Sequence, residues 1–456
     1  MYGLNNNQDS EDYLLYCGAA PGPLAIGEMG LPPSIKMFQV PVGTALVSGT
    51  FTSSYVELAG GQQKIRVLEN PQNIVSPCLQ RNVQSSIIAP LNNTMFNQFD
   101  AVSVGFRENK DISQPKDVWV PMSVEVEPLL RVQYIKAVSL FFNSGFQSSI
   151  TYDTIIGTYN NLKLDMSRIP QGNKKRIGWV KYDFTQNSWT LRNTNFTRGI
   201  IRDAGGIPFP LTVNGDDLSI NPNISPNDFK ILMKNADVII DQTEFPDGKG
   251  TYSSVFTRWR ALAGFPGVDD TPRVLDKRMV FSLDNTINKN GISDYQYRMP
   301  SRPDLLLRDL ISVQYPNYNE LYSKNYKTHF LNRNFQFDGP PDNSLGPDNC
   351  MDDPTAPVKY NSGDITVWPL EESFTGLAPP PPADGGGIYG VGGASQGDGA
   401  SGSGKSKTTS IIIAVVCVAA VLGAAFAFAF YKWSRRAKED RFIELEEEMN
   451  NEIPLN

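Results

Sequence analysis

The side chains of this chain that could bind a small molecule follow short apolar runs that read as buried strands. In α/β sheets, ligands bind outside the carboxyl ends of the strands. Aromatic faces beside a few hydroxyl, amide and acidic groups suit such a pocket. Tyr182 and Trp189 are the strongest candidates, because an aromatic ring near the mouth of a lobe can stack on a planar ligand. The predicted ligand-binding residues are Ser53, Ser54, Tyr55, Tyr182, Trp189, Gln242, Glu244, Asp294 and Tyr295, although each could also be an ordinary loop or core residue.

The chain has a single histidine, His329, which bears on metal chemistry. Capture of bare zinc or manganese would need clusters of His, Asp and Glu. We therefore expect His329 to be structural, no cofactor, and a ligand that brings its own metal donors. Arg131 and Arg202 could help to bind an anionic chelate, but we expect Arg131 to pair with Glu127.

Two sequence motifs resemble a phosphate-binding loop and a calcium-binding loop, but we expect neither site. Residues 399–406 fit G-x-x-x-x-G-K-S, but a phosphate-binding loop needs a strand before it and a helix after it. A Gly/Ser-rich stretch precedes this match instead. Residues 288–291 resemble a calcium loop, yet its first and twelfth positions would be Thr286 and Tyr297. With one histidine, we also expect no catalytic triad and no enzyme.

Composition sets the broad class of protein. The chain has 456 residues, a net charge of −7, 40% hydrophobic residues and 20% charged residues. Most of it can therefore bury a core. The negative charge argues against a nucleic-acid partner, because such proteins need a concentrated basic surface. Its 4 cysteines are too few for a disulfide scaffold.

Short apolar runs and helical patterns alternate between residues 36 and 336, which favours parallel sheets. Ser225 and Pro226 open one helix as N-cap and first residue, and Pro303 opens another. The predicted strands are Ala45–Val47, Ile65–Leu68, Asp100–Val104, Val118–Val120, Arg176–Tyr182, Ile207–Val213, Ala236–Asp241 and Arg278–Leu283.

A long helix is predicted between the two halves of this region. Pro128–Asn143 places its apolar residues on one face, begins with a proline and ends at Asn143-Ser144-Gly145. A second helix, with Ile150, Ile155, Tyr159 and Leu162 facing inward, stops before Pro170. The expected fold class is α/β, with two Rossmann-like lobes joined by a long bridging helix and one C-terminal transmembrane helix. Such a helical bridge permits only small changes of angle.

The ordered set of these segments resembles the helix-bridged, class III periplasmic-type substrate-binding proteins of ABC transporters. The resemblance covers about 300 residues and is carried by residues 118–123, 127–143, 202–206, 236–241 and 302–311. It implies an interlobe cleft that binds an iron–siderophore complex, a corrinoid, haem or a metal ion. This chain departs from that family in its C-terminal apolar segment, which indicates a membrane-anchored, eukaryotic surface version.

Ile411–Tyr431 contains 21 residues without a charge, enough to span a bilayer as a helix. More Lys and Arg residues follow this segment than precede it closely, which predicts a cytosolic C-terminus and an extracytoplasmic head. The N-terminal residues have no basic or strongly apolar region, so we expect no signal peptide and favour a start further upstream. Asn92, Asn195 and Asn223 are then candidate glycosylation sites.

A disulfide between Cys17 and Cys350 would tie down the two tails that flank the head.

The resulting division of the chain has eight parts. The parts are 1–35, a flexible arm; 36–127, the N-terminal lobe; 128–169, the bridging helices; 170–336, the C-terminal lobe; 337–377, an irregular extension; 378–410, a Pro/Gly/Ser-rich stalk; 411–431, the transmembrane helix; and 432–456, the cytosolic tail.

The sequence therefore predicts a single-pass, type I cell-surface receptor that captures a small ligand, such as an iron–siderophore chelate, for uptake by an unknown partner. Two alternatives remain open. One is an enzyme or chelatase on the same fold, since a fold does not fix function. The other is an adhesion or signalling ectodomain, which would be favoured if side chains fill the space between the lobes.

Overall fold

The computed structural model describes the part of the chain that forms the two predicted lobes. The described residues are 11–91, 101–108, 115–121, 127–209, 212–213, 216–217, 223–244, 255–266, 271–316, 328–333, 341 and 343–350. The predicted stalk, membrane segment, cytosolic tail and Asn92 lie outside them. Within these ranges no helix combines the length and the apolar character needed to cross a bilayer.

The N-terminal lobe is built on a five-stranded sheet in the order β5-β4-β3-β6-β7, with every pair parallel. The predictions of β3 and β4 are confirmed, because both are short runs of buried apolar residues. The next strand begins at Val104, where the prediction ended. The elements are β3 (Ala45–Val47), α2 (Thr50–Leu58), β4 (Ile65–Leu68), α3 (Pro77–Gln84), β5 (Ala89–Pro90), β6 (Val104–Arg107) and β7 (Asp117–Trp119).

The C-terminal lobe has a six-stranded mixed sheet, in which β8 is paired with β14, β10 and β9. β8, β10, β14 and β15 run parallel, but the predicted strand Ile207–Val213 is split, because Thr212–Val213 forms β11, which pairs antiparallel with β12 (Asp216–Asp217) in a separate sheet. We did not predict β9, which is antiparallel to β8, or β13, which is antiparallel to β9. The strands are β8 (Arg176–Asp183), β9 (Ser188–Leu191), β10 (Ile207–Pro208), β13 (Asn223–Ile224), β14 (Val238–Asp241) and β15 (Val280–Ser282).

Helices pack on this sheet, and the predicted cap of α9 is confirmed. The Ser225 hydroxyl accepts the Asp228 N–H at 3.1 Å, and Pro226 is the first helical residue. The helices are α8 (Asn195–Asp203), α9 (Pro226–Asn235), α10 (Val255–Leu262), α11 (Arg273–Asp276), α12 (Asp294–Arg298) and α13 (Pro303–Gln314).

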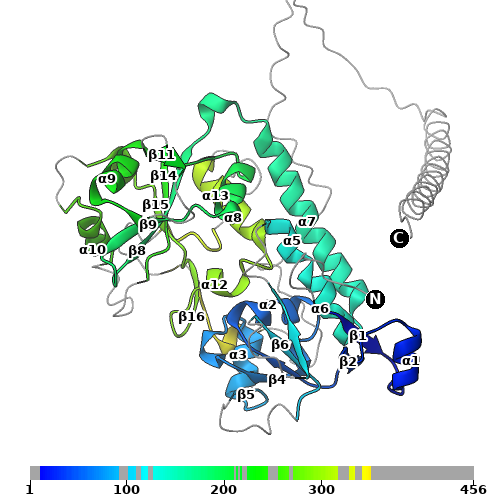
Figure 1. Ribbon diagram of the computed structural model, residues 1–456. Helices are drawn as coiled ribbons and strands as arrows, with labels where there is room; N and C mark the ends of the chain where they lie inside the picture. Colours follow the sequence, from blue (N-terminus) through cyan, green and yellow to red (C-terminus); the bar gives the residue numbers. More distant parts are fainter. Residues whose placement is uncertain are drawn as a thin grey trace, which may run out of the picture. The chain divides into compact units, whose positions relative to one another are not determined.

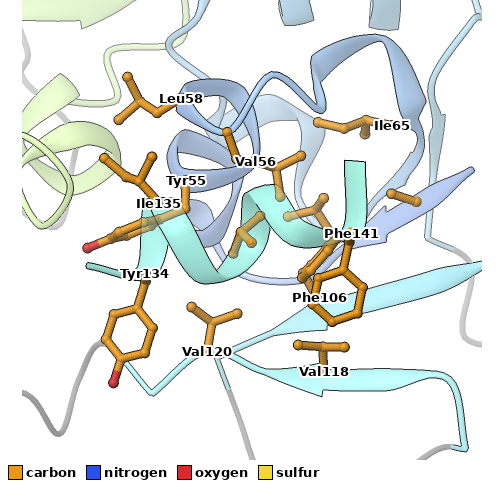
Figure 2. Packing of buried hydrophobic residues seen from close by; sticks show 14 of the residues in the cluster. Tyr55, Val56, Leu58, Ile65, Phe106, Val118, Val120, Tyr134, Ile135 and Phe141 are labelled. Carbon is orange, nitrogen blue, oxygen red and sulfur yellow. The ribbon is translucent and has the colours of Figure 1, made fainter. Parts of the chain in front are cut away.

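The bridge between the lobes is a different helix from the predicted one. The Pro128–Asn143 segment forms two short helices, α5 (Pro128–Val132) and α6 (Tyr134–Phe142), and α6 packs in the core of the N-terminal lobe (Figure 2). Asn143, with a φ of 56°, ends α6. The 23-residue helix α7 (Gly145–Ser167) follows (Figure 1).

Helix α7 contributes to both hydrophobic cores. Ile155 belongs to the N-terminal core, whereas Tyr159, Leu162 and Met166 belong to the core between α7, α13 and β8. The predicted inward positions Ile155, Tyr159 and Leu162 are confirmed, whereas Ile150 is 46% exposed. At 1.5 Å per residue α7 is about 34 Å long, so one rigid element links the lobes.

Residues 11–35 are not a loose arm, contrary to the prediction. Strand β1 (Tyr13–Tyr16) pairs in parallel with β2 (Lys36–Gln39), and the short helix α1 (Pro23–Glu28) lies between them in sequence. The Tyr13 ring packs edge-on against Phe38 and Phe141, with centroids 5.9 and 6.3 Å apart. Burial of aromatic surface on the N-terminal lobe orders this segment.

The disulfide prediction was wrong in one partner. Cys350 is bonded to Cys78 of α3, and Cys17 is an exposed free thiol. The Arg81 side chain, one turn beyond Cys78, donates to the Pro347 carbonyl at 3.3 Å. The segment before Cys350 also forms β17 (Asn343–Leu345), which pairs with β16 (Thr286–Asn288). These contacts hold residues 343–350 against α3 and leave Cys17 without that partner.

Candidate functional site

Helices α2 and α12 form the closest polar contact between the N-terminal lobe and the segment that follows β15. The Ser54 and Ser301 hydroxyls are 2.6 Å apart, and the Tyr297 hydroxyl donates to Glu57 at 2.5 Å. These four residues are buried. Side chains, rather than solvent, therefore fill this part of the junction.

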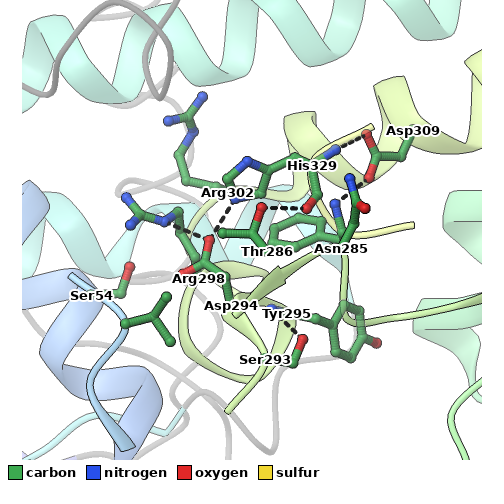
Figure 3. A network of polar contacts seen from close by, with 12 residues as sticks. Ser54, Asn285, Thr286, Ser293, Asp294, Tyr295, Arg298, Arg302, Asp309 and His329 are labelled. Atoms are coloured by element: carbon green, nitrogen blue, oxygen red, sulfur yellow. Dashed lines mark hydrogen bonds and ion pairs between the residues drawn. The ribbon is translucent and has the colours of Figure 1, made fainter. Parts of the chain in front are cut away.

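Asp294 lies at the centre of a buried polar network (Figure 3). Its Oδ2 accepts from Arg298 Nε at 3.0 Å and lies 2.5 Å from Nε2 of His329. Burial raises the pKa of Asp294, but the nearby charges of Arg298 and His329 outweigh it and leave that pKa below its ordinary value. His329 is thus held in place by Asp294.

A second buried carboxylate, Asp309, fixes the chain around His329. Its two oxygens accept the backbone N–H groups of His329, Phe330 and Leu331 at 2.8, 2.6 and 3.0 Å. A carboxylate with this many N–H donors is well stabilised although it is buried. The network therefore orders the segment that carries the histidine.

Glu57 makes the α2–α12 contact sensitive to pH. Burial raises its pKa to about 7, in spite of Arg298 and of hydrogen bonds from Ser76 and Tyr297. Because the folded state holds this proton more tightly, stability is lost as pH rises from the ordinary carboxyl pKa through 7. We expect Glu57→Gln to remove about 3 kcal/mol of this pH dependence. Urea unfolding of the wild type and of Glu57→Gln at pH 5 and pH 8 measures this difference. An equal change in unfolding free energy between the two pH values in both proteins would contradict it.

The carboxyl edge of the N-terminal sheet has its own acidic residues at the start of α2. Glu108 accepts the backbone N–H groups of Phe51 and Thr52 at 3.0 and 3.2 Å, and Glu69 accepts from Ser48 at 2.6 Å. Burial raises the pKa of Glu108. Because these carboxylates already use the N–H donors of the helix end, this edge does not offer an anion site.

A cluster of cationic and aromatic groups meets where α2, α5, β8 and α12 come together. Burial raises the pKa of Tyr295 (α12), and the charges of Arg192 and Arg131 act in the opposite direction. Burial also raises the pKa of Tyr55 (α2), again opposed by Arg131. The Trp179 ring lies 6.2 Å from that of Tyr295. We call these five residues, Tyr55, Arg131, Trp179, Arg192 and Tyr295, the arginine–aromatic cluster.

Three buried donors of the arginine–aromatic cluster make no hydrogen bond within the described part of the chain. They are the Tyr55 hydroxyl, Nε of Arg192 and Nε1 of Trp179. Buried polar atoms in native proteins usually have a partner, so these three donors are available to an acceptor that the described residues do not supply. Both arginines are only half-buried, which leaves them within reach of a ligand.

The structure places the predicted ligand-binding residues in several different environments. Tyr55 and Tyr295 belong to the arginine–aromatic cluster. Ser53, Ser54 and Asp294 are enclosed by protein, and Gln242 is half-buried. Glu244 is exposed and pairs with Lys181 at 3.3 Å.

The two residues favoured from sequence, Tyr182 and Trp189, lie in the C-terminal core. Trp189 stacks on Phe229 with centroids 3.9 Å apart, and Tyr182 packs edge-on against Trp189. Both rings are therefore buried in the core. Strand β9 runs antiparallel to β8, and this pairing places Trp189 against Phe229 of α9.

Arg192 and Trp179 were not predicted as ligand residues. They face each other across the β8–β9 hairpin, where the Arg192 N–H donates to the Trp179 carbonyl at 2.7 Å. The alternating run Ser188–Leu191 was the available signal for β9. Arg131 was considered for an anionic ligand; its guanidinium lies 4.3 Å above the Phe196 ring. The ion pair between Arg131 and Glu127 stays a prediction.

Comparison with known proteins gives similarity only at the level of solved structures. No family model and no curated protein matches the chain. A periplasmic binding protein from Veillonella parvula is 10% identical and covers 59% of this chain and 90% of its own, with a TM-score of 0.44. The periplasmic heme-binding protein HutB of Vibrio cholerae is 9% identical, and its match covers 60% of this chain and 100% of HutB, with a TM-score of 0.43.

CeuE of Helicobacter pylori, in a complex with nickel and histidine, is 11% identical and covers 64% of this chain and 91% of its own, with a TM-score of 0.44. The structures from Veillonella parvula and Vibrio cholerae are described as periplasmic binding proteins, the class that the sequence resembles. At such TM-scores the likeness carries no functional argument, so the function of this chain must be inferred from its own residues.

Proposed function

We propose that this chain is a binding protein that takes a small anionic ligand, such as a metal chelate, at the arginine–aromatic cluster. The observation that carries the proposal is the set of three buried, unpartnered donors beside two half-buried arginines. The elements that bear them come from both lobes and from α5. A ligand bound here therefore contacts both lobes.

The chemistry of the cluster favours a chelate over a bare ion. Guanidinium and hydroxyl groups donate to oxygen acceptors, and arginine pairs well with carboxylate-like anions. Within the described ranges no group of three or more His, Cys, Asp or Glu residues could hold a metal ion. The metal must then arrive with its own donors, and the aromatic rings can pack against an organic chelator.

The two arginines give the sharpest test of this assignment. We expect Arg131→Met and Arg192→Met each to weaken binding of an anionic chelate by about 10- to 100-fold, since each removes a charge-assisted hydrogen bond. The matched control is Arg176→Met on the same strand as Trp179, where the arginine is 49% exposed. Isothermal titration with ferric hydroxamate, ferric catecholate, haem and cobalamin measures the constants.

Two outcomes of this titration contradict the proposal. Absence of binding to all four compounds argues against the ligand class. Binding that the Arg131 and Arg192 variants leave as tight as the control variant argues against the site. Circular dichroism of each variant verifies that the fold is retained.

We also propose that Ile411–Tyr431 anchors the head at a cell surface and that the ligand is passed on for uptake. The uncharged run and the cationic residues after it support this part of the proposal. Asn195, at the start of α8, is exposed and open to glycosylation. Extraction of the chain from membranes by alkaline carbonate would contradict the anchor.

A second candidate, a scaffold that binds no small ligand, is favoured by the side chains that fill the α2–α12 junction. The Ser54–Ser301 and Glu57–Tyr297 contacts are both buried and would hold the lobes together without a ligand. The same titration separates the two candidates, because a scaffold would bind none of the compounds.

A further inference from the structure

An apolar cavity of about 570 Å³ lies in the N-terminal lobe, and its lining contains none of the residues of the arginine–aromatic cluster. Its walls come from β1 and the residues after α1 on one side, and from β7 and α6 on the other. This volume lies within the range of small-molecule sites. The ordering of residues 11–35 on the lobe, which the sequence did not predict, is what creates the cavity.

None of the side chains that line this apolar cavity is charged. The polar atoms of two lining residues are already used: the Tyr13 hydroxyl accepts the Trp119 N–H at 2.9 Å, and the Trp119 indole donates to the Glu108 carbonyl at 3.1 Å. The lining thus offers mainly hydrocarbon surface, and a ligand would be held by burial of its own hydrocarbon.

The wall formed by residues 11–35 is open to solvent and adaptable. Met29 is 50% exposed, and Leu14 and Leu31 are half-buried, although all three line the cavity. Exposed apolar side chains gathered around a cavity are a feature of ligand-binding grooves. Methionine adjusts its shape to a flexible chain.

We infer that the apolar cavity binds a single long aliphatic chain, such as that of a fatty acid or a fatty alcohol. The charged groups nearby lie outside the lining: Lys36 donates to Glu11 at 3.0 Å and to the Asp117 carbonyl at 3.1 Å. The polar end of the ligand therefore stays at the mouth, and the chain alone is enclosed. This site goes beyond the proposed binding of a chelate.

The test uses cis-parinaric acid, a fluorescent fatty acid, with the full-length chain held in amphipol and with amphipol alone as the blank. We expect saturable binding of one molecule per chain, with displacement by both palmitate and hexadecanol. Ala137→Phe, on α6, fills the cavity from a half-buried position and should weaken binding by about tenfold or more. Ala261→Phe, exposed on α10, is the matched control and should bind like the wild type.

A second variant keeps the test decisive if Ala137→Phe does not fold. Leu31→Asp places a charge in the outer wall, at a half-buried position, and should also weaken binding by about tenfold. The inference is overturned if cis-parinaric acid does not bind, or if a folded cavity variant binds it as tightly as Ala261→Phe. Displacement by neither palmitate nor hexadecanol would overturn it as well.

Discussion

Replacement of Asp294 by alanine is expected to lower the free energy of unfolding by about 3–5 kcal/mol, because it removes a carboxylate from a buried cation. Arg298 is 1% exposed and donates to Asp294, which is fully buried and also contacts His329. The cost arises mainly from the Arg298 guanidinium, which would lose its carboxylate without gaining water. Urea unfolding, followed by circular dichroism, measures the change.

The control for Asp294 is Asp348→Ala at the surface. Asp348 is 91% exposed and pairs with Lys289 at 3.3 Å, so its loss should change stability by less than about 0.5 kcal/mol. Equal stability of the two variants would show that the Asp294 network contributes little. Because the pKa of Asp294 is lowered, its contribution is present above the ordinary aspartate pKa and is lost as pH falls through the lower folded value.

Removal of the disulfide between Cys78 and Cys350 is expected to lower the free energy of unfolding by about 2–5 kcal/mol. The bond joins residues 272 positions apart, so it restricts the unfolded chain strongly. It also holds the segment with β17, which pairs with β16. The double variant Cys78→Ser/Cys350→Ser, measured by urea unfolding, tests this expectation.

Cys17→Ser is the matched control for the disulfide variant. Cys17 is exposed and unbonded, so its replacement should leave the unfolding midpoint unchanged. Peptide mass mapping without reduction gives an independent result. Recovery of a Cys17–Cys350 peptide in place of Cys78–Cys350 would contradict the structure.

Local patterns were sufficient for some of the parallel strands, but β5 was not predicted and β6 overlaps its prediction only at Val104. β3, β4 and β14 are short apolar runs between turns, the pattern typical of strands in a parallel sheet. β9 was missed because its partner lies in the preceding strand and Trp189 suggested a ligand contact instead. Pairing between strands is not visible in the pattern of one segment.

The bridging helix was assigned to the wrong segment for a related reason. The Tyr134–Phe142 part of the Pro128–Asn143 segment has the stronger apolar face because its buried residues pack on one core. Helix α7 contacts two cores in turn, so its apolar residues do not form one uniform stripe. A bridge between lobes therefore gives a weaker sequence signal than a helix inside a lobe.

The candidate site was predictable only in part. The rule that ligands bind beyond strand ends pointed to Tyr55 and Tyr295, which belong to the arginine–aromatic cluster. It failed for Ser53 and Ser54, because α2 begins directly after Gly49 and turns these hydroxyls into the lobe. Arg192 could not be placed without the β8–β9 pairing.

The most direct test of the central claim is a crystal structure of the chain with the chelate that binds most tightly. We predict acceptor atoms of the ligand within hydrogen-bond distance of Nε of Arg192 and of the Tyr55 hydroxyl, with Arg131 beside them. A chelate bound away from these residues, with the three donors still unpartnered, would contradict the claim.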